Sequence, residues 1–483
     1  MNQRAFVLRV IGILSIIFSF SMLPPMAVSV WYHDGEFSDF KVTFFTLFLI
    51  GLLFIVLSRN KLATLRRRDG VLIVASFWLY LSLVSTIPLV LGPHHLDLVD
   101  ALFEATSGMT TTGATVIADL SQIEPSILYY RQQLQWFGGM GLILLAIAVL
   151  PMLGVGGAQL YRGETPGPMK DEKLTPRLSH TARNLWLIYV LITGACAAGY
   201  WIAGMEPLEA LEHSYSTVST GGFSTHNESF AYFQSDAINN VAVIFMILGS
   251  FNFGVHFIAL RKRNPMLYLK DVEVRTFLLV VLFFVLLYTV FLYTSSTYED
   301  IGRSFEYALF EVTSIITSTG FGITDFTVWP LFLPVMLIFI SFIGGCGGST
   351  AGGIKVMRVL MMIKQGLHEF FVLLHPKAIR PVRVGNQILN ENVIQAIWGF
   401  FSVYIFVFIV LTLGMILAGM DQVTAFSAVA TCINNLGPGL GQVSANFADV
   451  SDSAKLVGVT AMLMGRLEVF TLLVILMPEF WRN

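Results

Sequence analysis

The sequence predicts an all-α polytopic membrane protein. Hydrophobic residues make up 55% of its 483 positions and charged residues 12%, a balance that water-soluble globular domains do not show. Apolar segments long enough for a membrane-spanning helix, which takes about 20 residues, recur along the whole chain. Shorter, half-apolar pieces that resemble one another lie between them. These observations predict spanning helices separated by short insertions that do not span.

Ten apolar segments qualify as spanning helices by their length. The first contains Pro24 and Pro25 and no convincing signal-peptide cleavage site, so we expect it to remain as a helix. The segments lie near residues 8–31, 41–58, 71–92, 134–152, 185–204, 238–260, 276–296, 331–363, 394–419 and 456–479.

Basic residues predict the orientation of the chain. They gather in four loops, near 59–68, 162–183, 261–275 and 355–383, which alternate with loops that are nearly free of Lys and Arg. Because Lys and Arg are enriched in the cytoplasmic loops of membrane proteins, we expect both termini in the cytoplasm.

Four of the short pieces share one register. In the first three a glutamate stands nine residues before a glycine, and in the fourth the glutamate position is Ala428. The glutamates and glycines are Glu104 and Gly113, Glu212 and Gly221, Glu311 and Gly320, with Gly437 in the fourth piece. The pieces read DALFEATSGMTTTGAT (100–115), EALEHSYSTVSTGGFS (209–224), YALFEVTSIITSTGFG (307–322) and TAFSAVATCINNLGPG (424–439). Repetition in register predicts four like units.

Each piece should form a helix of about a dozen residues, too short to span, followed by a tail without periodicity. Non-helical backbone is tolerated at membrane depth only against protein or a water-filled cavity, which predicts four re-entrant loops that enter from the outer face around a pseudo-fourfold pore. Carbonyl oxygens of the tails can replace the hydration shell of a cation, and the carboxyl end of each short helix favours a cation near the membrane middle. The candidate ion-binding residues are Thr111, Thr112, Gly113, Ser219, Thr220, Gly221, Ser318, Thr319, Gly320, Asn435, Leu436 and Gly437.

The repeat divides the chain into five parts, each later one built as a spanning helix (M1), a short helix with its tail (P) and a second spanning helix (M2). They are a two-helix N-terminal appendage (1–70), repeat 1 (71–160), repeat 2 (161–270), repeat 3 with the glycine-rich intramembrane loop (271–375) and repeat 4 (376–483).

A glycine-rich stretch, IGGCGGSTAGGIK (343–355), interrupts the eighth apolar segment. Glycine costs a helix about 1 kcal/mol relative to alanine, so we expect this helix to break and a loop to protrude below the tails. Arg466, an ionised side chain in an apolar helix, should face a cavity or a partner, and freed carbonyls of the loop are the nearest acceptors. We predict that the loop is a gate and that Arg466 latches it. The candidate gating residues are Gly344, Gly345, Gly347, Gly348, Ser349, Thr350, Gly352, Gly353 and Arg466.

Several motifs together match one family. They are TTTGAT, STGGFS, STGFG and NNLGPG in the tails, QWFGGMG (135–141), GETPGP (163–168), LTPR (174–177), GGCGGSTAGGIK and MGRLE (464–468). With them the chain resembles, over essentially its whole length, the TrkH family, the membrane subunits of bacterial Trk potassium uptake systems in the Trk/Ktr/HKT superfamily.

The resemblance implies potassium permeation across the bacterial inner membrane, with one pore in each chain and potassium bound in the tails as a selectivity filter. It further implies a homodimer, a gate at the glycine-rich loop, and control by a cytosolic nucleotide-binding ring called TrkA. Glycine in the first filter segment goes with potassium in the family, and Gly113 stands there. No organic cofactor and no nucleic-acid partner is expected for this chain.

Other interpretations of the same residues stay open. The stretch from Gly348 to Lys355 is one residue from a phosphate-binding GxxxxGK[ST] pattern, but no Ser or Thr follows the lysine and no strand precedes the stretch. Its glycines could serve helix packing alone. The glutamates of the short helices are more often braces than ion contacts, and Arg466 could pair with a carbonyl without gating anything.

The competing functions are a potassium symporter coupled to protons or sodium, a membrane-embedded enzyme, and a structural subunit. A symporter needs an ionisable group in the ion path, and the tails contain no Asp or Glu before Asp325. An enzyme is disfavoured because His368 and Glu369 do not extend to an HExxH pattern, and because the three cysteines form no CxxC pair. A purely structural role leaves four loops in register unexplained.

Overall fold

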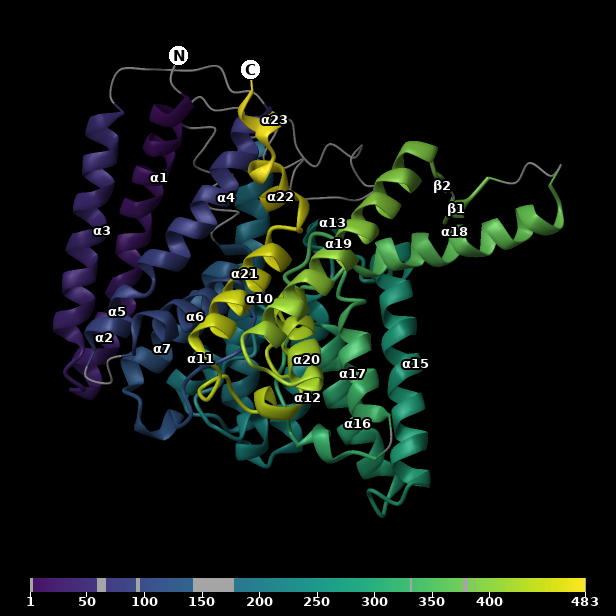
Figure 1. Ribbon diagram of the computed structural model, residues 1–483. Coiled ribbons are helices and arrows are strands. Elements are labelled where there is room, and N and C mark those ends of the chain that lie inside the picture. The colour runs from purple at the N-terminus through teal and green to yellow at the C-terminus, as the bar shows by residue number, and fades with distance from the viewer. Residues whose placement is uncertain are drawn as a thin grey trace.

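The computed structural model describes residues 3–58, 67–92, 96–141, 178–330, 332–376, 381–385 and 387–482. This part of the chain is almost entirely helical (Figure 1). Its strands are β1 (Arg383–Val384) and β2 (Gln387–Ile388), an antiparallel pair in which Arg383 faces Ile388 and Val384 faces Gln387. The motifs GETPGP and LTPR fall outside the described residues.

Helices of the first half of the chain come in three groups. The first is α1 (Gln3–Ser19), α2 (Leu23–Tyr32) and α3 (Phe37–Leu57), with the 3-10 turn η1 (Phe20–Met22). The second is α4 (Arg67–Val84), α5 (Ile87–Leu91), α6 (Leu98–Met109), η2 (Leu120–Gln122), α7 (Pro125–Trp136) and the π-helical turn η3 (Phe137–Gly141). The third is α10 (Leu178–Ala203), α11 (Pro207–Val218), η5 (Ser229–Phe233), α12 (Asp236–Gly249), α13 (Phe253–Lys262) and α14 (Met266–Lys270).

Helices of the second half repeat a similar order. One group is α15 (Val272–Thr294), α16 (Ile301–Ile316), η6 (Phe326–Val328), α17 (Leu333–Ser341) and α18 (Val356–Leu374). The other is α19 (Glu391–Leu417), α20 (Gln422–Asn434), η7 (Gly441–Val443), α21 (Asp452–Arg466), α22 (Phe470–Leu476) and α23 (Pro478–Trp481).

Local sequence signals set many of the helix starts. Side chains of Asp300, Asp421 and Ser451 accept backbone N–H groups at the first turns of α16, α20 and α21, which satisfies donors that have no partner inside a helix. Pro125 and Pro207 stand at the first positions of α7 and α11. Proline is favoured there because the backbone N–H group at this position, which proline lacks, makes no hydrogen bond within the helix. The four short helices of 12 to 16 residues, α6, α11, α16 and α20, agree with the lengths expected from the sequence.

Six helical stretches among the described residues are long and apolar enough to cross a membrane. They are Val7–Tyr32, Phe37–Leu57, Gly70–Leu91, Arg183–Ala203, Val272–Thr294 and Glu391–Leu417. Most of the expected segment 134–152 falls outside the described residues. The segment 331–363 is broken between α17 and α18, as the glycine content predicts.

Two of the segments expected to be single spanning helices, 238–260 and 456–479, are each broken into two helices by a sharp bend. The pair α12 and α13 bends by 98°, and the pair α21 and α22 by 111°. At the first bend the Asn252 side chain accepts the Gly254 N–H and starts α13 anew. At the second, Glu468 and Val469 have φ of 54° and 36°, and a right-handed helix contains no residue with positive φ.

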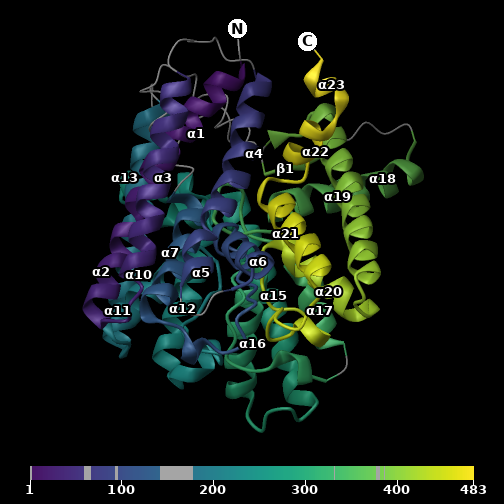
Figure 2. The same ribbon diagram turned by 60° about the vertical axis from the view of Figure 1, so that its left-hand side comes forward.

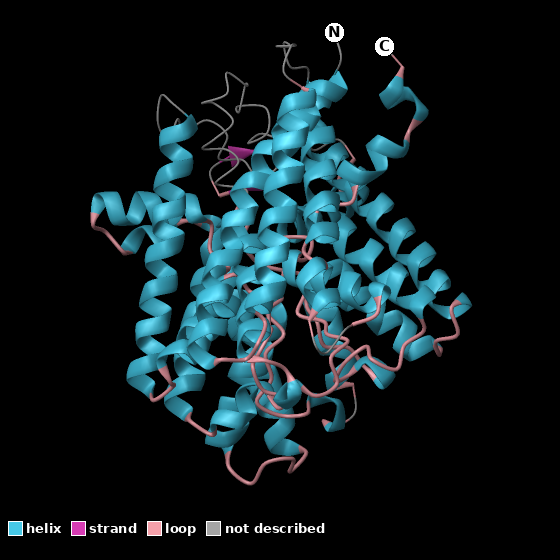
Figure 3. Cartoon of the chain, turned by 90° about the vertical axis from the view of Figure 1, so that its left-hand side faces the viewer, coloured by secondary structure: helices cyan, strands magenta, loops and turns pink. Residues whose placement is uncertain are grey.

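Eight helices pack in a closed cycle. In order, each contacts the next: α6, α7, α11, α12, α16, α17, α20 and α21, and α21 returns to α6. Loops run through the interior of this body, between the helices (Figure 3). The helices α1, α2 and α3 lie to one side of the cycle and contact it through α4 and α7 (Figure 1).

Helix α18 leaves the body of the molecule and projects sideways in both ribbon views (Figures 1 and 2). The start of α1 and the end of α23 lie at the same end of the molecule (Figure 1).

Candidate functional site: a ring of four glycine segments

One backbone turn follows each of the four short helices. Its first residue has a positive φ, as Thr111 has at 56° and Asn435 at 52°, and its third residue is a glycine with a positive φ between 80° and 95°. The N–H of the middle residue returns to a carbonyl of the helix end, for example from Thr112 to Ser107 at 2.9 Å. The same bond joins Gly221 to Ser216, Thr319 to Ser314 and Leu436 to Thr431. We call these turns ring segments 1 to 4: residues 111–113, 220–222, 318–320 and 435–437.

The four ring segments touch in a cycle. A Cβ atom added to Gly113 would collide with the carbonyl oxygen of Gly221, the middle residue of segment 2. In the same way Gly222 abuts Thr319 O, Gly320 abuts Leu436 O, and Gly437 lies against Thr112 O, where a Cβ would be 2.9 Å away. Glycine is therefore required at each contact both for its φ and for the missing side chain. Segments separated by about 100 residues in sequence form one closed ring.

The register expected for the second segment is wrong by one residue. Positive φ falls on Thr220 and Gly222, not on Ser219 and Gly221, so Gly222 is the equivalent of Gly113. Gly222 keeps some accessible surface, like Gly113 and Gly320, whereas Gly221 is buried. The sequence STGG offers two adjacent glycines, and counting from Glu212 selects the first of them. Ser219 belongs to the helix end, where it is the C-cap of α11.

Side chains behind the ring hold three of the segments. Glu104 accepts the Thr115 hydroxyl and the Val116 N–H, the latter at 2.9 Å. Glu311 accepts the Ile323 N–H at 2.8 Å. In segment 2 the equivalent position is His213, whose Nε2 lies 3.1 Å from the Ser224 hydroxyl, so Glu212 is not the counterpart of Glu104. These contacts favour a structural role for Glu104 and Glu311, as braces of the backbone, over direct contact with an ion.

The glycine loop, residues 344–353, lies against one side of the ring, the side on which Arg466 stands. Thr350 donates its hydroxyl to Val218 O at 3.0 Å, at the end of α11. The Gly352 N–H donates to the Ser318 hydroxyl of segment 3 at 2.5 Å, and a Cβ on Gly352 would collide with Asn434 O beside segment 4. One short loop therefore touches the chain at segments 2, 3 and 4.

Arg466 completes this set of contacts. Its Nη1 donates to the Thr111 hydroxyl of segment 1 at 3.2 Å and to Thr350 O of the glycine loop at 3.0 Å. Its Nη2 donates to Gly138 O and Gly139 O, both at 2.5 Å, in the π-helical turn η3. The expected contact between Arg466 and a loop carbonyl is confirmed.

One hydrogen bond and one ion pair tie the loop region to neighbouring helices. Glu273, at the start of α15, accepts the Gly347 N–H at 2.6 Å. Arg358, in the first turn of α18, pairs with Glu468 at 2.7 Å, at the bend between α21 and α22. Glu468 thus points away from Arg466, as its spacing of two residues predicts.

Outside the ring, the loops that leave the segments are joined to one another. Asn227 accepts the Leu120 N–H at 2.8 Å and donates to Asp119 at 2.9 Å, and the Phe447 N–H donates to Thr115 O at 2.7 Å. Hydrogen bonds from Ser121 and Asn227 hold the pKa of the Asp119 carboxyl below its ordinary value.

The chemistry of the ring is that of uncharged oxygen. Its segments offer carbonyl groups and hydroxyls of Thr and Ser, and no Asp, Glu or His stands within them. Among the described residues no cluster of three or more His, Cys, Asp or Glu side chains could hold a metal ion. Carbonyl and hydroxyl oxygens suit weakly bound monovalent cations, whereas tightly held divalent ions call for carboxylates.

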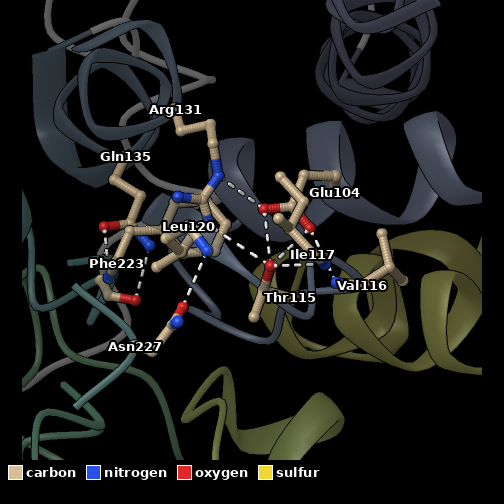
Figure 4. A network of polar contacts seen from close by, with 10 residues as sticks. Glu104, Thr115, Val116, Ile117, Leu120, Arg131, Gln135, Phe223 and Asn227 are labelled. Atoms are coloured by element: carbon tan, nitrogen blue, oxygen red, sulfur yellow. Dashed lines mark hydrogen bonds and ion pairs between the residues drawn. The ribbon is translucent and has the colours of Figure 1, made fainter. Parts of the chain in front are cut away.

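Two buried residues on α7, Arg131 and Gln135, bind the chain around the ring (Figure 4). The sequence pattern did not indicate Arg131, and it included Gln135 only as the first residue of QWFGGMG, with no role. The signal that singled out Arg466, an ionised side chain near an apolar segment, was also available for Arg131. The expected span began at residue 134 and excluded it.

A helical membrane protein with an internal ring of uncharged oxygens belongs, by fold and site, to the class of membrane cation transporters. Comparison with known proteins gives the same class: the model of the family TrkH, described as "Cation transport protein", matches residues 38–482. The chain belongs to the TrkH family.

The similar proteins match along their whole length. The chain is 48% identical to the Trk system potassium uptake protein TrkH of Vibrio parahaemolyticus, over 99% of both chains. It is 46% identical to the protein of the same name from Escherichia coli K12, over 100% of both, and 42% identical to the TrkG protein of that strain, over 98% of this chain and 97% of the relative. The crystal structure of the potassium transporter TrkH from Vibrio parahaemolyticus superposes with a TM-score of 0.91, at 46% identity and full coverage of both chains.

Proposed function

We propose that the chain carries potassium across the bacterial inner membrane through a gated, channel-like pore on the axis of the ring. The observation that carries the proposal is the cycle of contacts in which each ring glycine abuts the middle carbonyl of the next segment. A closed ring of backbone and hydroxyl oxygens can replace the water around an ion without holding it tightly. Potassium is the named substrate of the relatives, and Gly113 is the residue that goes with potassium in the family.

The same cycle supports a pore built from four M1-P-M2 units, 71–160, 161–270, 271–375 and 376–483, with 1–70 as an appendage. Each unit supplies one short helix and one ring segment, and the eight helices around the ring close on themselves. Ion-binding oxygens then come from residues 111–113, 220–222, 318–320 and 435–437. The fourth wall differs from the others because Asn435 donates its side-chain amide to the Thr112 hydroxyl at 3.0 Å.

The gate in this proposal is the glycine loop, latched by Arg466. A loop that touches the chain at three of four segments, and is bound to the first through Arg466, obstructs the inner end of the ring. For the pore to open, the glycine loop must move away from the ring. This movement breaks the hydrogen bonds of Arg466 and Thr350. In this proposal the described arrangement, with all of these contacts made, is the closed one.

Regulation by a cytosolic nucleotide-binding ring of the TrkA type, and assembly as a homodimer, complete the proposal. Apolar side chains of α18 at helical spacing are exposed, Leu367 to 62%, Phe370 to 66% and Leu374 to 76%, a stripe suited to a second copy of the chain. Both termini would lie in the cytoplasm. The start of α1 and the end of α23 lie at one end of the molecule, which supports the part of this proposal that places both termini on one side of the membrane (Figure 1).

A symporter coupled to protons or sodium is the alternative, and no observation favours it. Coupling to protons needs a titratable group in the ion path, whereas ring segments 1 to 4 carry none. Arg466 does not lose its proton in proteins.

The test is ion flux through purified protein in liposomes that contain potassium or sodium. We expect uptake of rubidium or potassium at least tenfold faster than uptake of sodium, and unitary current steps in planar bilayers. Equal fluxes of the two ions would overturn the ion assignment, and uptake without unitary steps would favour a carrier.

A further inference from the structure

Arg131 and Gln135 stand one turn apart on α7 and are almost completely buried, with exposed fractions of 1% and 0%. Burial of an arginine and a glutamine is costly unless their polar atoms are bonded. Arg131 points toward Glu104 and Thr115, and Gln135 points toward Phe223 (Figure 4). Helix α7 therefore places two polar groups beside the chain that follows ring segments 1 and 2.

Arg131 binds the chain that leaves segment 1. Its Nε donates to Glu104 at 2.7 Å and its Nη2 to the Thr115 hydroxyl at 3.2 Å. Glu104 in turn accepts the Val116 N–H. The guanidinium also lies over the ring of Phe223, 4.2 Å from its centroid, and Phe223 directly follows segment 2. The Arg131 side chain therefore contacts residues that follow segment 1 and the residue that follows segment 2.

Gln135 binds segment 2 through both ends of its amide. Its Nε2 donates to Gly221 O at 2.6 Å, and its Oε1 accepts the Phe223 N–H at 3.1 Å. The two bonds flank Gly222, the ring glycine of segment 2, so the peptide groups on either side of it cannot rotate without losing one of them.

The oxygen that Gln135 holds is the one against which Gly113 rests. A Cβ on Gly113 would collide with Gly221 O, and a free carbonyl could turn aside to admit it. A carbonyl held from behind by an amide has less freedom to do so. The demand for glycine at position 113 thus depends in part on a residue outside the ring.

The clamp is found at this junction and not at two others. Gly138, Gly249 and Gly465 make the same contact, each with a carbonyl at the end of the neighbouring short helix: Met109 O, Val218 O and Ile433 O. Three positions before these glycines stand Gln135, Met246 and Met462. The methionine side chains cannot donate a hydrogen bond to a ring carbonyl as the Gln135 amide does, although the backbone carbonyl of Met462 accepts the Asn435 side-chain amide at 3.1 Å. Packing at this place therefore does not by itself require a glutamine.

We propose that Arg131 and Gln135 are positioning residues that fix segments 1 and 2 against each other and thereby set the discrimination between potassium and sodium at this corner of the ring. The inference rests on the proposed function. A carbonyl released from Gln135 gains freedom to move toward a smaller cation, so a looser corner should admit sodium more readily.

The test compares Gln135→Met, the residue that the equivalent positions carry, with the unsubstituted protein in liposomes. Loss of one hydrogen bond corresponds to roughly a three- to tenfold change, and we expect the ratio of potassium to sodium flux to fall by that factor while total flux persists. Arg131→Lys, which keeps the charge beside Glu104 but loses the planar group over Phe223, should lower the ratio less. It serves as the second variant if Gln135→Met does not fold.

A double-mutant cycle separates positioning from general stability. Gly113→Ala should reduce potassium flux less in the Gln135→Met background than in the unsubstituted protein, by at least threefold, because the Gly221 carbonyl can then move. Unchanged flux ratios in folded Gln135→Met, or additive effects in the cycle, would overturn the inference and leave the proposed function intact. An unsubstituted protein without preference for potassium would instead overturn the proposed function.

Discussion

Arg466 donates from Nη1 to the carbonyl oxygen of Thr350 at 3.0 Å, and so joins the helix α21 to the glycine loop beneath the ring. The same nitrogen reaches Thr111 of segment 1, which places the guanidinium between the ring and the loop. Hydrogen bonds from a charged donor contribute about 1.5 to 3 kcal/mol each, enough to decide between two loop positions.

Replacing Arg466 should therefore open the pathway. We expect Arg466→Ala to raise potassium flux into liposomes, in the absence of any partner protein, by about tenfold, since 1.4 kcal/mol corresponds to a factor of ten. Arg466→Lys, which keeps one charged donor, should raise it less. A flux that stays at the level of the unsubstituted protein would place the obstruction elsewhere.

The register of segment 2 gives a second prediction. Gly222→Ala should abolish potassium flux, because the residue has φ of 83° and its Cβ would collide with Thr319 O. Gly221→Ala should reduce the flux less, because its Cβ would meet the Gln135 amide and no backbone atom, although displacing that amide should lower the preference for potassium.

The matched control for these two variants is Gly194→Ala on α10, whose Cβ would meet nothing within 4 Å. It should leave both flux and thermal stability unchanged. If Gly221→Ala proved more damaging than Gly222→Ala, the register seen in the backbone would not be the functional one.

The ion pair between Arg358 and Glu468 links α18 to the bend after α21. Its 2.7 Å distance and partial burial, with side chains 14% and 30% exposed, predict a measurable coupling of about 0.5 to 3 kcal/mol. Arg358→Glu should lower the melting temperature of the detergent-solubilised protein, and Arg358→Glu combined with Glu468→Arg should recover part of the loss. Purely additive effects would mean that the pair contributes nothing by itself.

Glu36 predicts a dependence of stability on pH. It is fully buried between α2 and α3, and neither of its carboxylate oxygens has a hydrogen-bond partner among the described residues. Burial, and then the charges of Asp39, Glu124 and Asp34, raise the pKa of Glu36 from 4.5 to about 7. The folded chain therefore holds this proton more tightly than the unfolded chain, and stability falls as pH rises from 4.5 through about 7.

Melting temperatures between pH 5 and pH 8 check this prediction. Glu36→Gln has no carboxyl to titrate, so it should remove the fall in melting temperature that results from deprotonation of Glu36. The substitution of the exposed Glu299, Glu299→Gln, should leave that fall unchanged. Equal pH profiles for Glu36→Gln and the unsubstituted protein would show that the carboxyl is not protonated in the folded state.

Much of the architecture could be predicted because it depends on local properties. Spans follow from apolar length, and the break between α17 and α18 follows from glycine content. The bends at 250–252 and 467–469 could not be predicted this way, since neither stretch is rich in glycine. Each depends on a few side-chain and backbone bonds, such as that of Asn252 to Gly254.

The ring could be predicted from the sequence, but the contacts of the residues around it could not, even where an ionised residue near an apolar segment, Arg131, was itself visible. Four pieces in register led to segments that the structure brings together, and the one error arose where two glycines are adjacent. Arg131, Gln135 and His213 act through contacts with residues far along the chain or in a shifted register. The periodicity of apolar residues within one helix does not predict contacts with residues that are far away in the sequence.

The four corners of the ring come from one polypeptide and differ in composition, from Thr-Thr-Gly to Asn-Leu-Gly. In a channel made from four identical subunits, any single codon change is imposed on every corner at once. Here a codon change alters one corner and leaves three as they were. At positions other than the four ring glycines, a gene of this kind can therefore alter one corner at a time, which four identical subunits do not allow.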